Sequence, residues 1–224
     1  KIGKVFDHCT HTYSIGMKLL TRCFWDGKSF IPLDFSIHNE PGKTGNRGLR
    51  KKDLDNQFSK ERAIDTAGFK RVSEIEINKI LMSITLIANA LKSKITANYV
   101  LADSWFICEN FINGIKSLSN KIDVIGLFKT NRIIELNGKN HKANSIPDLK
   151  RKEIKYCKSL KCKYIALTFN YKGIEAKGFW VKMNGQESWK LLICTDTKLT
   201  FIKAMKYYQI RWSIEVFFND CKQN

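Results

Sequence analysis

The sequence predicts an α/β fold in which a mixed sheet is flanked by helices, and three observations support this prediction. In residues 1–131, short apolar runs alternate with segments of helical periodicity, an order typical of sheets with parallel strands. From residue 132 to about 190, strand-like runs are separated by turn signals, which predicts a β-rich insertion. The chain has 224 residues, of which 43% are hydrophobic, enough for one sizeable core or for a core with an inserted subdomain.

Near the start, the sequence predicts a β-hairpin. Two strand-like runs, residues 13–25 and 28–37, meet at Asp26-Gly27, which is a strong hairpin turn signal. Pro32 lies inside the second run and places that strand at a sheet edge. The chain is then polar and basic from residue 38 to about 71, which predicts a loop that contacts phosphates.

The middle of the chain predicts two helices and two strands. Ser73 and Glu76 form a capping-box pattern, so we expect a helix from there to about Lys92. The apolar run 99–102 predicts a strand that ends at Asp103, followed by a helix to about Leu118. Residues 122–128 predict another buried strand.

Strands are also predicted at 164–169, 174–183 and 189–195. We therefore expect residues 1–131 and 191–224 to form one core and residues 132–190 to form the inserted subdomain. Residues 191–224 would supply a return strand and the last helix of the core.

That last helix carries a spaced set of polar residues: Tyr208, Arg211, Glu215 and Lys222. At about 100° per residue, the four fall within roughly 60° of one another, on one helical face. A carboxylate with two cations and a phenol is suited to binding a metal and phosphates. The opposite stripe, Ile210, Ile214, Phe217 and Cys221, is expected to be buried. Alternatively, Arg211 and Glu215 are an ordinary i, i+4 pair on a solvated face.

Asp103 is the second candidate site residue. It ends a buried strand, and α/β sheets bind ligands at the carboxyl ends of their strands. Alternatively, Asp103 caps the following helix, because Asp is a favoured N-cap residue. Asp196 is expected to be a cap as well. Trp105 and Trp212 each flank a candidate residue, and we expect core packing for both in preference to stacking on a base.

The charge of the chain favours a polyanionic partner. There are 39 Lys and Arg against 21 Asp and Glu, a formal net charge of +18. Nucleic acid is the first expectation, and the longest apolar run, residues 80–91, is too short to span a membrane. Seven cysteines without disulfide-framework spacing predict reduced thiols. The cluster Asp7, His8, Cys9 and His11 lacks the second ligand pair that a zinc site needs.

Together these segments resemble the DDE transposases of the bacterial insertion-sequence-4 superfamily. Residues 101–106, Leu-Ala-Asp-Ser-Trp-Phe, are similar to the segment that carries that family's second catalytic aspartate. The series Tyr208-x2-Arg211-x3-Glu215-x6-Lys222 matches the family's Tyr-Arg-Glu-Lys signature without a gap. The segments 4–8 and 30–32 look like the family's first hairpin, and the β-rich insertion lies where the family carries one. The resemblance covers nearly the whole chain.

The resemblance implies an RNase H-like fold and a DNA transposase, which cleaves and transfers DNA strands at the ends of an insertion element. Its three carboxylates hold two Mg²⁺ ions, for which Mn²⁺ can substitute, and such ions take oxygen ligands. Asp103 and Glu215 are then the expected catalytic residues and metal ligands. Arg211 and Lys222 are expected to bind DNA phosphates, and Tyr208 to bind a phosphate or orient Glu215.

The first aspartate of the family lies on a strand upstream of the hairpin, and the resemblance implies that this chain begins after it. We therefore expect the central first strand of the sheet to be absent, and this fragment alone to be inactive and poorly folded. Asp7 is the alternative first ligand, although its surroundings match the segment after that strand.

The alternative function is a catalytically inactive, DNA-binding remnant of a transposase. An intact enzyme is expected to act as a homodimer on element ends and target DNA, in the bacterial cytoplasm with the nucleoid.

Overall fold

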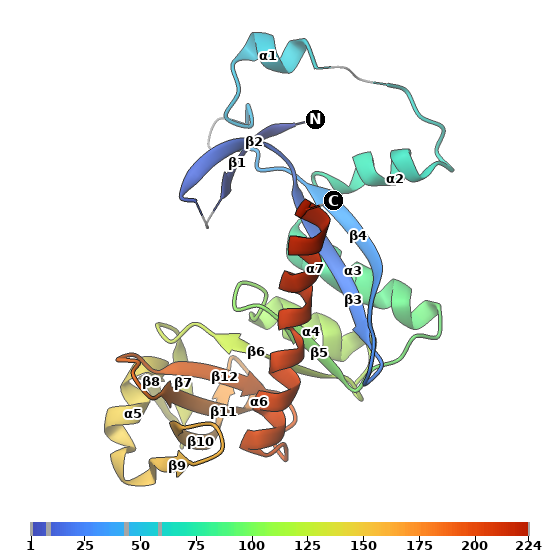
Figure 1. Ribbon diagram of the computed structural model, residues 1–224. Helices are drawn as coiled ribbons and strands as arrows, with labels where there is room; N and C mark the ends of the chain where they lie inside the picture. The colour runs from blue at the N-terminus through green and yellow to red at the C-terminus, as the bar shows by residue number, and fades with distance from the viewer. Residues whose placement is uncertain (1, 8–9, 43–44, 58–59, 224) are drawn as a thin grey trace. The chain divides into compact units, whose positions relative to one another are not determined.

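The chain, represented by a computed structural model, folds into two units, Lys1–Ser93 (unit 1) and Lys94–Asn224 (unit 2). The structure describes residues 2–7, 10–42, 45–57 and 60–223, with the backbone alone for residues 222 and 223. Both units combine helices and strands, and unit 2 holds a mixed eight-stranded sheet flanked by helices (Figure 1). The α/β prediction is therefore confirmed. Within the described residues, no helix has both the length and the apolar content needed to cross a membrane.

Unit 1 contains two separate antiparallel strand pairs. They are β1 (Gly3–Asp7) with β2 (Thr12–Gly16), and β3 (Lys18–Trp25) with β4 (Phe30–His38). The predicted hairpin at Asp26-Gly27 is confirmed, because the Asp26 carboxylate accepts the N–H groups of Lys28 (2.7 Å) and Ser29 (2.6 Å). Pro32 lies opposite Cys23, where the register shifts at a bulge, a position that tolerates the missing N–H. The single strand predicted over residues 13–25 is wrong, since β2 and β3 belong to different sheets.

Three helices follow in unit 1: α1 (Lys51–Asp55), α2 (Ala67–Glu74) and α3 (Lys79–Lys92). The predicted loop over residues 38–71 therefore contains α1 and the start of α2. The capping-box prediction is wrong, because Ser73 lies inside α2 and its hydroxyl donates to the Lys70 carbonyl (2.8 Å). Instead Asn78 caps α3 by accepting the Ile80 N–H at 2.8 Å. The end of α3 at Lys92 agrees with the sequence.

The sheet of unit 2 has the strand order β5–β6–β12–β11–β10–β7–β8, and β9 pairs with β10 (Figure 1). The strands are β5 (Tyr99–Ala102), β6 (Asp123–Phe128), β7 (Ile133–Leu136), β8 (Lys139–Lys142), β9 (Lys155–Cys157), β10 (Cys162–Tyr171), β11 (Ile174–Met183) and β12 (Lys190–Cys194). Only β5 and β6 are parallel, joined through α4 (Glu109–Leu118), whereas β6 pairs antiparallel with β12. The predicted strands at 99–102 and 122–128 are confirmed.

Helices cover both faces of this sheet. On one face, α6 (Phe201–Ile210) packs on β6, β10, β11 and β12, and the ring of Phe201 stacks on Tyr164 with centroids 4.0 Å apart. On the other face, the fully buried Trp180 donates its indole N–H to the Ala143 carbonyl (2.7 Å). That carbonyl belongs to a short helical segment with η1 (Ala143–Ser145), α5 (Ile146–Leu149) and η2 (Arg151–Glu153). The chain closes with α7 (Trp212–Gln223).

The strands between residues 132 and 190 lie in the same sheet as β5 and β6. The contacts within the chain divide it between residues 93 and 94. The expected limits of an inserted subdomain at 132 and 190 stay a prediction. What the topology establishes is that β5, β6 and the β-rich segment together position the end of β5 next to α6.

Candidate active site

Asp103 follows β5 directly and begins a tight turn. Its backbone carbonyl accepts the Phe106 N–H at 3.0 Å, and its side chain accepts the N–H of Ser104. Helix α4 begins only at Glu109, with Cys108 as its N-cap residue. The interpretation of Asp103 as a helix cap is therefore wrong, because five residues separate it from the helix. Its carboxylate is exposed at the carboxyl end of β5, where a ligand site was predicted.

The turn after Asp103 packs against strand β6 of the sheet. Gly126 of β6 lets Ile107 approach so closely that a Cβ at this position would lie 2.4 Å from the Ile107 Cδ1 atom. The guanidinium of Arg132 donates to the Ile107 carbonyl and lies over the ring of Phe128, 4.9 Å from its centroid. These contacts fix the turn and hence the position of Asp103.

No sequence motif directly indicates these contacts below Asp103. Gly126 lies inside a strand pattern, and such a glycine signals a close backbone approach, but the approaching residue is not identifiable from sequence. Arg132 belongs to no sequence motif that would predict its contact with the Ile107 carbonyl.

Tyr208, Arg211 and Glu215 lie where two helices meet. The predicted single helix is interrupted: α6 ends at Ile210 and α7 begins at Trp212. Arg211 lies between them, with i→i+3 hydrogen bonds from its N–H to the Tyr208 carbonyl and from the Ile214 N–H to its own carbonyl, both 3.1 Å. Its φ of −53° and ψ of −30° remain helical, so the chain continues in nearly the same direction. The three side chains therefore share one face, as predicted.

Arg211 connects these side chains electrostatically. Its Nη2 atom lies 2.7 Å from Glu215 Oε1, and its guanidinium carbon lies 5.4 Å from the centroid of the Tyr208 ring. Burial acts to lower the pKa of Arg211, but the hydrogen bond to Glu215 and the charges of Tyr208, Glu215 and Asp103 outweigh it and raise that pKa. The Asp103 carboxylate is thus within electrostatic reach of the same guanidinium.

Tyr208 and Arg211 leave hydrogen-bonding capacity unused. Burial raises the pKa of Tyr208, Asp103 raises it further, and Arg211 opposes both. Among the described residues, the Tyr208 hydroxyl and the Arg211 Nε atom are shielded from solvent and have no partner within hydrogen-bonding geometry, although Arg211 and the Leu127 backbone lie near enough to the hydroxyl to lower its pKa. Buried polar atoms are costly to leave unpaired, so these two atoms suit a polar ligand such as a phosphate.

Lys222 lies in the last turn of α7, about 10 Å along the helix axis from Glu215. Its side chain is outside the described part of the chain, and so are His8 and Cys9 of the N-terminal cluster. Asp7 belongs to β1 in unit 1. Of the five predicted site residues, Tyr208, Arg211 and Glu215 therefore lie together, and Asp103 lies within electrostatic range of Tyr208 and Arg211.

The donor set fits a hard divalent cation in part. Asp103 and Glu215 offer carboxylate oxygens, and Mg²⁺ commonly takes one or two carboxylates together with waters and substrate phosphates. Across the described ranges, no group of three or more His, Cys, Asp or Glu side chains is placed to hold a metal. The donor types of the two acids therefore suit one ion, and a second ion needs a ligand that they do not supply.

Three other expectations near the site are wrong. Trp105 is 48% exposed and Trp212 is 63% exposed, so neither packs in the core. Asp196 does not cap α6, whose N-cap is Thr200, and instead accepts the Tyr99 hydroxyl at 2.9 Å. In the predicted buried stripe, Ile210, Ile214 and Phe217 are half-buried and Cys221 is exposed.

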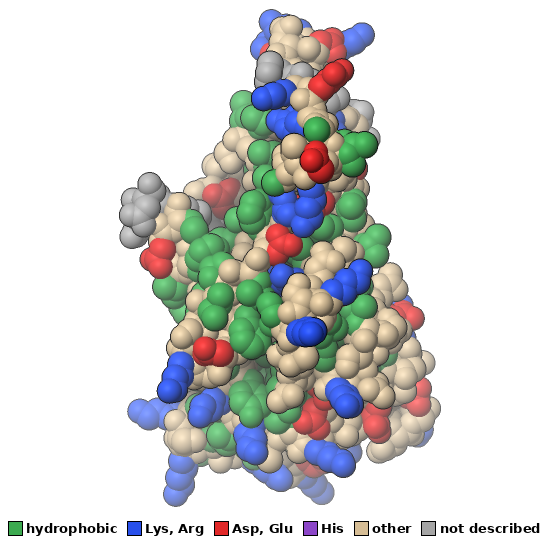
Figure 2. Space-filling model, turned by 90° about the vertical axis from the view of Figure 1, so that its right-hand side faces the viewer, with side chains coloured by type: hydrophobic (Ala, Val, Ile, Leu, Met, Phe, Trp, Pro, Cys, Tyr) green, Lys and Arg blue, Asp and Glu red, His purple; other side chains and the backbone are tan. Residues whose placement is uncertain are grey.

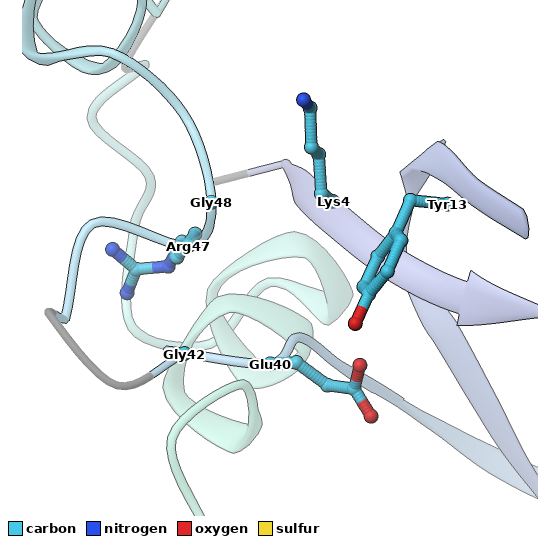
Figure 3. Close-up of a pocket in the computed structure, with 6 residues that line it drawn as sticks. All are labelled: Lys4, Tyr13, Glu40, Gly42, Arg47 and Gly48. Carbon is cyan, nitrogen blue, oxygen red and sulfur yellow. The ribbon is translucent and has the colours of Figure 1, made fainter.

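Unit 1 contains a cavity of about 460 Å³ lined by Lys4, Tyr13, Glu40, Gly42, Arg47 and Gly48. Figure 3 shows the Tyr13 hydroxyl directed toward Glu40, whereas the charged ends of Lys4 and Arg47 point away from one another. Glu40 is already paired with Lys18, and Arg47 with Glu76. The cavity does not gather its charges around a common point, so we do not consider it the active site.

No family model, curated protein or solved structure matches this chain. The candidate site therefore depends on its own geometry. It consists of a carboxylate after β5, and a phenol, a guanidinium and a second carboxylate at the α6–α7 junction.

Proposed function

We propose that this chain is the catalytic part of a DDE transposase, a metal-dependent enzyme that cleaves DNA at the ends of an insertion element and joins the freed ends to target DNA. The observation that carries the proposal is that Asp103 lies within electrostatic range of Tyr208 and Arg211, more than 100 residues later in the chain, and that Arg211 is paired with Glu215. The spacing of those three residues matches the Tyr-Arg-Glu-Lys signature, and a surface ion pair alone would not place Asp103 beside them.

The topology supports an RNase H-like interpretation. An antiparallel strand pair, β3–β4, is followed by helix α3, then by β5, α4 and the parallel strand β6. Among the described residues, β5 pairs on one side only, so the sheet has a free edge beside Asp103. A strand added there parallel to β5 would bring its carboxyl end to the same place, and in the proposed fold that strand carries the first aspartate.

Each side chain then has a role. Asp103 and Glu215 would hold Mg²⁺, which, when bound, stabilises the charge that develops on phosphate oxygens, with two ions expected in the intact enzyme. Arg211 would bind a DNA phosphate in a bidentate fork while remaining next to Glu215. The Tyr208 hydroxyl would donate to a phosphate oxygen and so satisfy a buried group. Lys222 would contribute a point charge farther along the strand. We place this activity on bacterial chromosomal DNA, with two copies of the enzyme holding two element ends.

The test is DNA cleavage by the native full-length protein, with duplexes that carry the DNA flanking its own gene. With Mg²⁺, we expect nicks that leave 3′-hydroxyl ends, followed by joined products. Asp103→Asn and Glu215→Gln should each reduce cleavage by more than about 100-fold. Even substitution of a residue that only hydrogen-bonds to a metal ligand lowers metal affinity or activity about 10- to 100-fold. Asp148→Asn and Glu187→Gln, which remove exposed acids of unit 2, serve as matched controls. Cleavage that survives both site substitutions would refute the proposal.

The second candidate is a DNA-binding remnant without catalytic activity. It is favoured by one observation: the described residues provide two acids for the site and no third metal ligand near them. Binding of Mn²⁺, followed by its electron paramagnetic resonance signal, separates the candidates without an activity assay. An active enzyme should bind Mn²⁺ and lose it in the Glu215→Gln variant. A remnant should bind flanking DNA equally well with and without the metal, and should not cut it.

A further inference from the structure

The most basic part of unit 2 lies around β9 and β10, away from the candidate active site. Seven of the chain's 39 Lys and Arg residues, but only one of its 21 acidic residues, fall within residues 150–163. The acid, Glu153, is paired with Lys150 at 2.9 Å. The remaining six cations are exposed: Arg151, Lys152, Lys155, Lys158, Lys161 and Lys163.

Cross-strand pairing brings a further lysine into this group. Lys163 of β10 lies directly opposite Lys182 of β11 and directly opposite Tyr156 of β9. Residues opposite one another in antiparallel strands point to the same face, so the three side chains form one row across three strands. Tyr156 is 52% exposed, and its hydroxyl accepts a hydrogen bond from the Asn184 side chain at 3.3 Å.

This row is unfavourable for the fold alone. Like charges directly opposite in a sheet are destabilising, and adjacent strands lie only about 4.8 Å apart. Within the described residues, neither Lys163 nor Lys182 has an ion-pair partner, and the same holds for Lys158 and Lys161 in the β9–β10 turn. A bound polyanion would neutralise this repulsion.

We propose that Tyr156, Lys158, Lys161, Lys163 and Lys182, termed the β9–β10 basic surface, bind the phosphate backbone of double-stranded DNA. The choice of DNA as partner rests on the proposed function. Lysine ammonium groups bind phosphates as point charges without reading sequence, so this surface would position DNA and would not select it. Figure 1 draws β9 and β10 at the lower left, on the side turned away from the viewer in Figure 2, whose visible face carries other Lys and Arg side chains along its lower margin.

Helix α6 and the Lys163–Lys182 row lie on opposite faces of the sheet. Tyr164, the residue after Lys163, stacks on Phe201 at the start of α6. Successive residues of a strand point to opposite faces, so Lys163 and its cross-strand neighbour Lys182 point away from α6. A duplex bound to this row would therefore contact the sheet on the face opposite α6.

The test compares two triple variants of the native protein that lose the same charge. Lys158→Gln/Lys163→Gln/Lys182→Gln removes cations of the proposed surface. Lys121→Gln/Lys139→Gln/Lys142→Gln removes three exposed lysines elsewhere in unit 2. Duplex binding is measured in EDTA, so that no cleavage occurs, at several salt concentrations. Equal thermal unfolding midpoints and circular dichroism spectra establish that both variants fold.

For the first variant we expect the slope of log K against log salt to fall by about 0.9 for each lost phosphate contact, a total of nearly 3. The loss of affinity should be the same for all duplex sequences. The control variant should keep the wild-type slope. Equal losses in the two variants, or no duplex binding by the wild type, would overturn the proposal.

Vesicles that contain phosphatidylserine provide a second arm. If the first variant loses vesicle binding but keeps duplex binding, the surface serves a membrane and the proposal is wrong. The proposed function can fail separately: if Asp103→Asn still cleaves DNA while the first triple variant loses its salt dependence, the surface binds DNA and the catalytic assignment is wrong.

Discussion

The two units contain the same kinds of elements but differ in how their strands are paired. In unit 1, β1–β2 and β3–β4 form separate two-stranded sheets, whereas in unit 2 most strands of the sheet have a neighbour on each side. The described buried hydrophobic side chains of unit 1 are Val5, Ile75, Met82, Leu86 and Ala90, and all the others lie in unit 2. Two-stranded hairpins are marginally stable alone, so unit 2 is the stable scaffold of the candidate site and unit 1 is the weaker part.

The largest effect on the free energy of unfolding is expected from removing core side chains. These variants test directly whether unit 1 and unit 2 differ in stability. Trp180→Ala deletes a fully buried ring and its hydrogen bond and should cost about 3–5 kcal/mol. Leu86→Ala should cost about 2–5 kcal/mol in unit 1. Hydrogen exchange followed by mass spectrometry should show Trp180→Ala deprotecting β10–β12, and Leu86→Ala deprotecting β3, β4 and α3. If Leu86→Ala deprotects β10–β12 equally, the two units unfold as one and do not differ in stability.

A smaller effect is expected at Gly126, under the turn that positions Asp103. In Gly126→Ala, the new methyl group would lie 2.4 Å from Ile107 Cδ1 and 2.7 Å from the Ala102 carbonyl oxygen. The backbone must shift, at a cost of about 1–3 kcal/mol measured by urea unfolding. DNA cleavage should fall as well, since Asp103 moves with the turn. Ile107→Ala in the same chain makes room for the methyl group, so the double variant should lose less stability than the sum of the two single variants. Additive losses would mean that the two residues do not press on each other.

The smallest effect is a pH dependence confined to unit 1. Burial lowers the pKa of His38 below its usual 6.5, the charge of Lys79 lowers it further, and the ring is hydrogen-bonded to Ser36 at 2.8 Å. The unfolded chain therefore binds this proton more readily, and the stability of unit 1 should fall as pH drops below about 6.5. Hydrogen exchange at pH 7.5 and 5.5, corrected for intrinsic rates, should show β4 losing protection relative to β11. His38→Gln should abolish that difference, and a loss of equal size in β11 would contradict the prediction.

The sequence was most informative where a local pattern decides the structure. The strand at residues 99–102 and its neighbour near 123–128 were predicted because short apolar runs were bounded by turn residues. The hairpin at Asp26-Gly27 followed from turn chemistry, and Gly27 has a φ of +105°. The three-residue group Tyr208, Arg211 and Glu215 followed from helical spacing.

The rest depends on choices that local patterns leave open. Ser73 and Glu76 satisfy a capping box, but Asn78 is also a good N-cap residue and lies next to α3. The sequence therefore offers two possible starting points for this helix. Asp103 was a reasonable cap until the position of Cys108 showed where α4 begins. The break at Arg211 is invisible in sequence because its dihedral angles remain helical. The neighbour of β6 is set by packing, and no local signal identifies β12.

That pairing of β6 with β12 has a consequence for how the protein is made. Phe128 lies opposite Leu191, so 63 residues must be synthesised after β6 before its partner strand exists. At about 5–20 residues per second, the nascent chain would leave β6 unpaired on that side for roughly 3 to 13 seconds. On the ribosome, β6 therefore pairs with β5 on one side only, and its other edge is exposed. Chaperones bind such exposed apolar segments. We expect the yield of folded protein to depend on them, and on the pace of translation between β6 and β12.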